Sequence, residues 1–130
     1  MKNGSDVVLD ASALIALMRE ESGAERVATR IDRALIGAVN LAEVTSKFVR
    51  EGIAIGVVRD WIDALELEVR PFDRELAYAA GALLPATRGH GLSLGDRACL
   101  ALARTLGATA LTTDRAWREV EVGVAIEVIR

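Results

Sequence analysis

The chain has 130 residues, which suits one domain, residues 1–130, and leaves little room for a second. Its net charge of −3 at pH 7 excludes a protein that holds nucleic acid through overall positive charge, so such binding would need local arginines and a metal ion. With one cysteine, no signal-peptide pattern and no apolar run of membrane-spanning length, the sequence predicts a cytoplasmic protein without a membrane partner.

Short apolar runs alternate with segments of helical periodicity along the whole chain. In chain order, the expected elements are strand 6–10, helix 11–19, helix 23–33, strand 34–39, helix 41–51, helix 54–65, strand 67–70, helix 73–84, helix 94–106, strand 108–113, a short helix 116–120 and strand 124–129. Strands that alternate with helices in this way predict an α/β fold, in which helices cover both faces of a parallel sheet.

Four acidic residues are expected at or near the edge of the sheet that is formed by the carboxyl ends of the strands. Ligands bind at this edge in open α/β sheets. Asp10 ends the first strand, and Asp114 follows strand 108–113. Glu43 is expected in the first turn of the helix after strand 34–39. Asp96 lies in the first turn of a helix that follows a loop, so its position on this edge is inferred less directly. We expect these side chains to converge on one crevice.

Clustered carboxylates repel one another and raise one another's pKa, and a divalent cation removes that penalty. Mg²⁺ and Mn²⁺ prefer oxygen ligands, and Mg²⁺ commonly combines a few carboxylates with waters and a substrate phosphate. One such ion, or two ions roughly 4 Å apart, can position a phosphodiester and activate a water. The pattern therefore indicates a metal-dependent nuclease.

Each acid also has a purely structural interpretation, because carboxylates cap helices. Asp10 could cap the helix from Ala11, and Asp114 could cap the short helix after it. The spacing of a capping box occurs twice, in Asn40-x-x-Glu43 and in Ser93-x-x-Asp96. A residue can hold both roles, since a cap already lies at the strand edge.

At these residues the sequence resembles PIN domains, specifically the VapC-type toxin ribonucleases of type II toxin–antitoxin pairs. The matching segments follow the family's order and span nearly the whole chain: VLDASAL at 8–14, NLAEV at 40–44, LSLGDRACLALA at 92–103 and LTTDRAW at 111–117. The third and fourth segments together are fairly specific, whereas the first alone is weak.

The resemblance implies a three-layer α/β/α sandwich with a short, mainly parallel central sheet, and an Mg²⁺- or Mn²⁺-dependent endoribonuclease. It assigns metal binding and catalysis to the full acidic set, Asp10, Glu43, Asp96 and Asp114. Ser12 and Thr112 match small hydroxyl positions that orient ligands or water. The resemblance also implies a homodimer that a VapB-like antitoxin inhibits by placing its tail in the site.

Arg97 and Arg115 each follow one of these acids directly, so they could contact RNA phosphate, a neighbouring carboxylate or only solvent. The mean hydropathy of +0.28 is high for a small domain and indicates a second apolar surface. Phe48 and Trp61, on neighbouring expected helices, are either ordinary core residues or the lining of a groove for a partner helix.

Three alternatives remain at this point. A receiver-type phosphoacceptor domain has a similar length and an acid at a strand end, but it needs a lysine at a late strand end, and the two lysines are Lys2 and Lys47. A non-catalytic binding module would keep the fold without the reaction, although no acid is missing. A PIN-type nuclease of RNA maturation would have the same site as a toxin.

Overall fold

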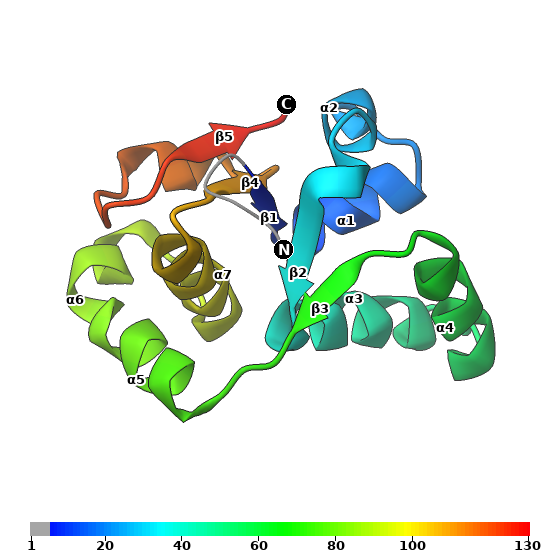
Figure 1. The fold of residues 1–130 in the computed structure, drawn as a ribbon, viewed down its shortest axis with the longest axis horizontal. Helices are drawn as coiled ribbons and strands as arrows, with labels where there is room; N and C mark the ends of the chain where they lie inside the picture. The colour runs from blue at the N-terminus through cyan, green and yellow to red at the C-terminus, as the bar shows by residue number, and fades with distance from the viewer. Residues whose placement is uncertain (1–5) are drawn as a thin grey trace.

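A five-stranded, fully parallel sheet forms the centre of the computed structural model, which describes residues 6–130 (Figure 1). Its strands are β1 Val7–Leu9, β2 Ala34–Gly37, β3 Glu68–Arg70, β4 Thr109–Thr112 and β5 Ile126–Val128. They are arranged in the order β3-β2-β1-β4-β5. The chain leaves the central strand β1 toward β2 and later returns on its other side at β4, so the topological switch lies between β1 and β4.

Helices cover both faces of this sheet (Figure 1). One layer contains α1 Ala11–Met18, α2 Ala24–Ala28, α3 Ala38–Arg50 and α4 Ile55–Ala64. The other layer contains α5 Arg74–Ala82, α6 Leu84–Thr87 and α7 Leu94–Leu106. Residues 6–130 also contain three short 3-10 helices, η1 Ile31–Arg33, η2 Arg88–His90 and η3 Arg115–Glu119. The predicted three-layer α/β/α sandwich is confirmed, and the sheet is parallel throughout.

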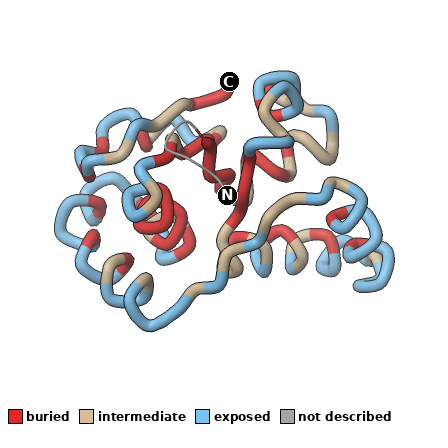
Figure 2. The backbone as a smooth tube through the Cα atoms, in the orientation of Figure 1, coloured by how far each residue is buried: buried red, intermediate tan, exposed pale blue. Residues whose placement is uncertain are grey.

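Two hydrophobic cores lie on the two faces, because successive strand residues point to opposite sides. Val8, in register with Leu35 and Ala110, packs into the core that contains α7. Leu9 packs into the core that contains α1 and α3. The buried residues in Figure 2 accordingly gather in the central strands and in α7. Within residues 6–130, no helix combines the length and apolar character needed to cross a bilayer.

The expected helix 23–33 is divided into α2 and η1. Arg30, between the two segments, donates from both terminal guanidinium nitrogens to Glu127 of β5 at 2.7 Å. Such a bidentate pair fixes the guanidinium group and ties this segment to β5.

The elements after β3 also differ from prediction. The expected helix 73–84 ends at Ala82, and Pro85 lies in the first turn of α6 instead of closing a helix, a position where its missing N–H removes no hydrogen bond. The expected short helix 116–120 is the 3-10 helix η3. The first five residues of the predicted single domain lie outside the described residues.

Candidate metal centre

Asp10 lies directly after β1 and caps α1, a role that the sequence had left open. Only 4% of the residue is exposed. Its Oδ1 accepts hydrogen bonds from Ser12 Oγ at 2.7 Å and from the backbone N–H of Ala13 at 2.8 Å. Its Oδ2 accepts a hydrogen bond from Thr112 Oγ1 at 2.6 Å. The carboxylate is therefore fixed by two strand ends and by the first turn of a helix.

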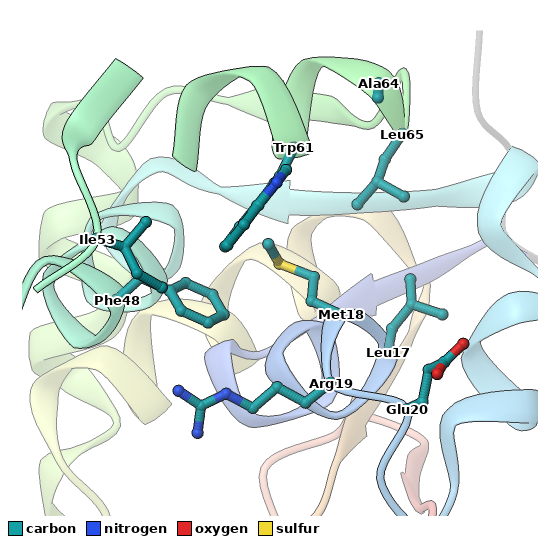
Figure 3. Close-up of a pocket in the computed structure, with 9 residues that line it drawn as sticks. All are labelled: Leu17, Met18, Arg19, Glu20, Phe48, Ile53, Trp61, Ala64 and Leu65. Carbon is teal, nitrogen blue, oxygen red and sulfur yellow. The ribbon is translucent and has the colours of Figure 1, made fainter. Parts of the chain in front are cut away.

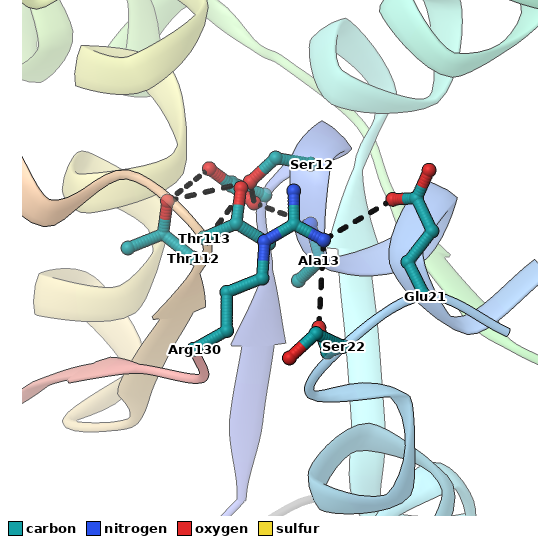
Figure 4. A network of polar contacts seen from close by, with 8 residues as sticks. Ser12, Ala13, Glu21, Ser22, Thr112, Thr113 and Arg130 are labelled. Carbon is teal, nitrogen blue, oxygen red and sulfur yellow. Dashed lines mark hydrogen bonds and ion pairs between the residues drawn. The ribbon is translucent and has the colours of Figure 1, made fainter. Parts of the chain in front are cut away.

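Ser12 and Thr112 join this carboxylate to the end of β4 (Figure 4). Ser12 Oγ accepts a hydrogen bond from the N–H of Thr113, and Thr112 Oγ1 accepts one from the N–H of Asp114, both at 3.0 Å. Each hydroxyl thus accepts a hydrogen bond from a backbone N–H and donates one to Asp10. These two bonds define the orientation of the hydroxyl. The two hydroxyl residues predicted to orient ligands or water are placed to orient Asp10.

Burial raises the pKa of Asp10 to about 6, even though its three hydrogen bonds act in the opposite direction. The negative charge of Asp96 raises this pKa further. Within residues 6–130, no arginine, lysine or histidine forms an ion pair with Asp10. A buried carboxylate without a cationic partner is unfavourable when ionised, and a metal ion would relieve it.

Asp96 and Asp114 both have the capping roles that the sequence allowed. Asp96 Oδ2 accepts from the N–H of Ser93 at 2.9 Å, and Ser93 Oγ accepts from the N–H of Asp96 at 3.2 Å, so the capping box is confirmed. Asp114 caps η3 through the N–H of Ala116 at 3.0 Å. Burial raises the pKa of Asp96, and the negative charge of Asp114 adds to this effect.

Glu43 is not part of a capping box, and the prediction for Asn40-x-x-Glu43 was wrong. β2 passes directly into α3, whose N-cap is Gly37, so Asn40 and Glu43 lie inside the helix and Glu43 is in its second turn. Asn40 is 1% exposed and donates from Nδ2 to Glu43 Oε1 at 2.8 Å and to the carbonyl oxygen of Gly95 at 3.1 Å. Sequence reasoning noted Asn40 only as a cap and missed this role.

Three of the four acids, Asp10, Glu43 and Asp96, lie near enough to α7 to act electrostatically on its buried Cys99. Burial raises the pKa of the Cys99 thiol well above its usual value, and the charges of Asp10, Asp96 and Glu43 add to this effect. Among residues 6–130, however, no three Asp, Glu, His or Cys side chains are close enough to form a ready-made metal cage. The oxygen-only set fits an open site, because Mg²⁺ keeps several waters and needs only one or two carboxylates.

The two arginines next to the acids differ in their surroundings. Arg97 is half-buried and donates from Nη1 to the carbonyl oxygen of Ala80 in α5 at 3.2 Å. Arg115 is exposed, and its Nε donates to the carbonyl oxygen of Arg130 at 3.4 Å. Contact with RNA stays a prediction for both residues, and Arg115 is the more accessible of the two.

An apolar groove of about 620 Å³ lies between the end of α1 and the pair α3 and α4 (Figure 3). Phe48 is buried, as the core interpretation predicted, whereas Trp61 is 44% exposed. The two rings meet edge to face with centroids 5.7 Å apart. The groove is lined by Leu17, Met18, Arg19, Glu20, Phe48, Ile53, Trp61, Ala64 and Leu65. The predicted groove beside Phe48 and Trp61 is therefore present.

A family model of the PIN domain matches residues 7–123. The chain therefore belongs to the PIN domain family, whose members are nucleases, and the family predicted from the sequence is confirmed. No curated protein matches the sequence.

In fold, the chain is similar to toxin–antitoxin structures. DNA-bound VapBC from Salmonella typhimurium matches with a TM-score of 0.74 and 18% identity over 95% of this chain and 97% of that one. VapBC2 from Rickettsia felis, bound to a promoter DNA fragment, matches with a TM-score of 0.72 and 15% identity over 93% and 96%. VapBC-5 from Mycobacterium tuberculosis matches with a TM-score of 0.62 and 23% identity over 97% and 98%.

Proposed function

We propose that the protein is an Mg²⁺- or Mn²⁺-dependent endoribonuclease and the toxin of a toxin–antitoxin pair. The observation that carries this proposal is the Asp10 carboxylate, buried at the switch between β1 and β4 and oriented by two hydroxyls. The charge of Asp96 raises the pKa of Asp10, and the charge of Asp114 raises the pKa of Asp96, which supports placing these three carboxylates in one site. Without a cation, this concentration of negative charge opposes the approach of a phosphodiester.

Asp10, Glu43, Asp96 and Asp114 would hold the ion. When bound, the ion would neutralise charge on the phosphate and lower the pKa of a water. The hydrogen bonds from Ser12 and Thr112 keep the Asp10 carboxylate in one orientation, which lowers the entropy lost when it becomes a ligand. Arg115, exposed beside Asp114, is placed to contact an RNA phosphate. Attack of water on phosphorus would leave a 5′-phosphate and a 3′-hydroxyl.

We also propose a VapB-like antitoxin as the partner of the groove beside Trp61. An apolar groove between helices suits the apolar face of a short helix. Arg19 and Glu20 add charge to an otherwise mostly apolar lining. The structural relatives named above were solved as VapBC systems, which is consistent with such a partner.

A homodimer is proposed on the same family basis. Large apolar side chains other than Trp61 are exposed outside the groove, and they supply surface for self-association. These residues are Val49, Ile55, Val57, Val69, Tyr78, Leu84 and Leu94. Sedimentation of the purified protein tests the dimer directly.

The decisive experiment is RNA cleavage by the purified protein with Mg²⁺ or Mn²⁺, with and without a chelator. We expect cleavage of single-stranded or looped RNA that stops when the chelator is added. Products with cyclic phosphate ends would show attack by the RNA 2′-hydroxyl and contradict the proposed hydrolysis. Cleavage that survives the chelator would contradict the metal requirement.

A role in RNA maturation instead of toxicity uses the same site, and growth arrest on expression distinguishes the two. The receiver-type alternative is disfavoured by the strand order β3-β2-β1-β4-β5, because flavodoxin-like signalling domains have the order 2-1-3-4-5. Within the described residues, the carboxyl end of β4 also carries Thr112 and Asp114 where that chemistry requires lysine.

A further inference from the structure

The carboxylate of Glu43 packs directly against the backbone of Gly95 in the first turn of α7. A Cβ atom built on Gly95 would lie 2.6 Å from both Cδ and Oε1 of Glu43, and closer still to Oε2. Cβ atoms do not approach other heavy atoms to within 3.0 Å, so any side chain at position 95 would displace this carboxylate. Glycine is therefore required for Glu43 to lie beside the turn that carries Asp96.

Nothing in the backbone of Gly95 explains the choice of glycine. Among the described residues, the glycines with positive φ are Gly23, Gly52, Gly91, Gly107 and Gly123, and Gly95 does not belong to this set. Inside a helix, glycine is less favourable than alanine because it loses more conformational entropy on folding. Helical stability alone would favour a larger residue at this position, so the contact with Glu43 is the feature that glycine permits.

Asn40 holds the same carboxylate from the other side. Its Nδ2 donates to Glu43 Oε1 and to the carbonyl oxygen of Gly95, and these two contacts define the orientation of the amide. Its Oδ1 is buried and has no hydrogen-bond partner among the described residues. A buried amide kept in this half-satisfied state calls for a functional explanation.

We propose that Gly95 and Asn40 are positioning residues that hold the Glu43 carboxylate beside Asp96 and thereby set the affinity of the centre for divalent cations. The inference rests on the proposed function, because it takes these carboxylates as the metal ligands. Asn40 connects α3, which carries Glu43, to α7, which carries Asp96. Outer contacts of this kind keep a ligand in place and raise metal affinity.

The test is Gly95→Ala in the full chain, with Mn²⁺ affinity measured by titration calorimetry and thermal stability measured in a chelator. We expect affinity to fall roughly tenfold or more, the range for loss of a supporting contact. The melting temperature without metal should stay level or rise, because alanine favours the helix and Glu43 is exposed and free to turn outward. Gly81→Ala in α5 is the matched control, since its Cβ would meet nothing within 4 Å.

A second pair of variants distinguishes positioning from general damage. In a Glu43→Ala background, Gly95→Ala should cause no further loss of Mn²⁺ affinity, because the displaced group is already absent. Equal losses in both backgrounds, or wild-type affinity in Gly95→Ala, would overturn the positioning role while leaving the metal site intact. Absence of any Mn²⁺ binding by the unmodified protein would overturn the metal site itself, and this inference with it.

Discussion

Thr112 Oγ1 donates a 2.6 Å hydrogen bond to Oδ2 of Asp10, although the two residues are 102 positions apart in the sequence. The same oxygen accepts a 3.0 Å hydrogen bond from the N–H of Asp114. Thr112 is fully buried, so neither bond competes with bulk water. One hydroxyl therefore couples the orientation of Asp10 to the position of Asp114.

Thr112→Val keeps the shape of the side chain and removes this hydroxyl. We expect a loss of about 1–3 kcal/mol in the free energy of unfolding, because Asp10 loses a buried donor and the Asp114 N–H loses its acceptor. The rate of RNA cleavage should fall strongly even under conditions in which the variant stays folded, because the positions of two carboxylates, Asp10 and Asp114, are disturbed together. Thr105→Val is the control, because the Thr105 hydroxyl bonds only to the Ala101 carbonyl of its own helix. Equal activity in the two variants would contradict the role of Thr112.

The raised pKa of Asp10 predicts how stability depends on pH when no metal is bound. The folded protein holds this proton up to a pKa of about 6, whereas the ordinary value is 3.8, so the folded state binds more protons between these values. The contribution of Asp10 to stability is thus fully present below about pH 4 and lost as the pH rises through about 6. The difference between the two pKa values corresponds to about 3 kcal/mol.

Denaturant unfolding in a chelator at pH 5 and pH 7.5 measures this dependence. Asp10→Asn carries no titrating group at this position, so its stability should change less between the two pH values than that of the unmodified protein. A parallel pH response in both proteins would show that Asp10 does not titrate in this range.

Much of the centre was predictable because its signals are local. Asp10 follows an apolar strand, and the spacing of Ser93 and Asp96 indicates a capping box, so short sequence windows locate both. The strand pattern also predicted the parallel sheet, which brings the ends of β1 and β4 to one edge.

The remaining features depend on contacts that no short window contains. The ion pair of Arg30 joins it to Glu127, 97 residues away, and the role of Asn40 depends on Gly95, 55 residues away. The start of α3 was predicted too late because Gly37 supplies no capping side chain that would mark it. Asn40 has the spacing of a capping residue and was therefore considered as the N-cap of this helix. The N-cap is Gly37, which lies three residues earlier.

Asp96→Asn is expected to abolish cleavage and growth arrest while leaving the fold intact. An asparagine oxygen can still accept the hydrogen bond from the Ser93 N–H, so the capping box survives while the negative charge is removed. Asp60→Asn, at an exposed position of α4, is the control and should retain both activities. Growth arrest by Asp96→Asn equal to that of the unmodified chain would contradict a catalytic role for this carboxylate.

Trp61→Ala is expected to separate antitoxin binding from nuclease activity. The Trp61 ring is 44% exposed in the groove and contacts the buried Phe48 at its edge, so its removal takes away apolar contact area and leaves the core largely unchanged. An anchoring tryptophan at an interface typically contributes about 2 kcal/mol or more, which corresponds to a roughly 30-fold weaker complex with the cognate antitoxin. RNA cleavage by the free variant should persist, because none of the groove residues belongs to the acidic set. Tyr78→Ala, an exposed aromatic on α5 outside the groove, should leave antitoxin affinity unchanged, and an equal loss in both variants would place the partner elsewhere.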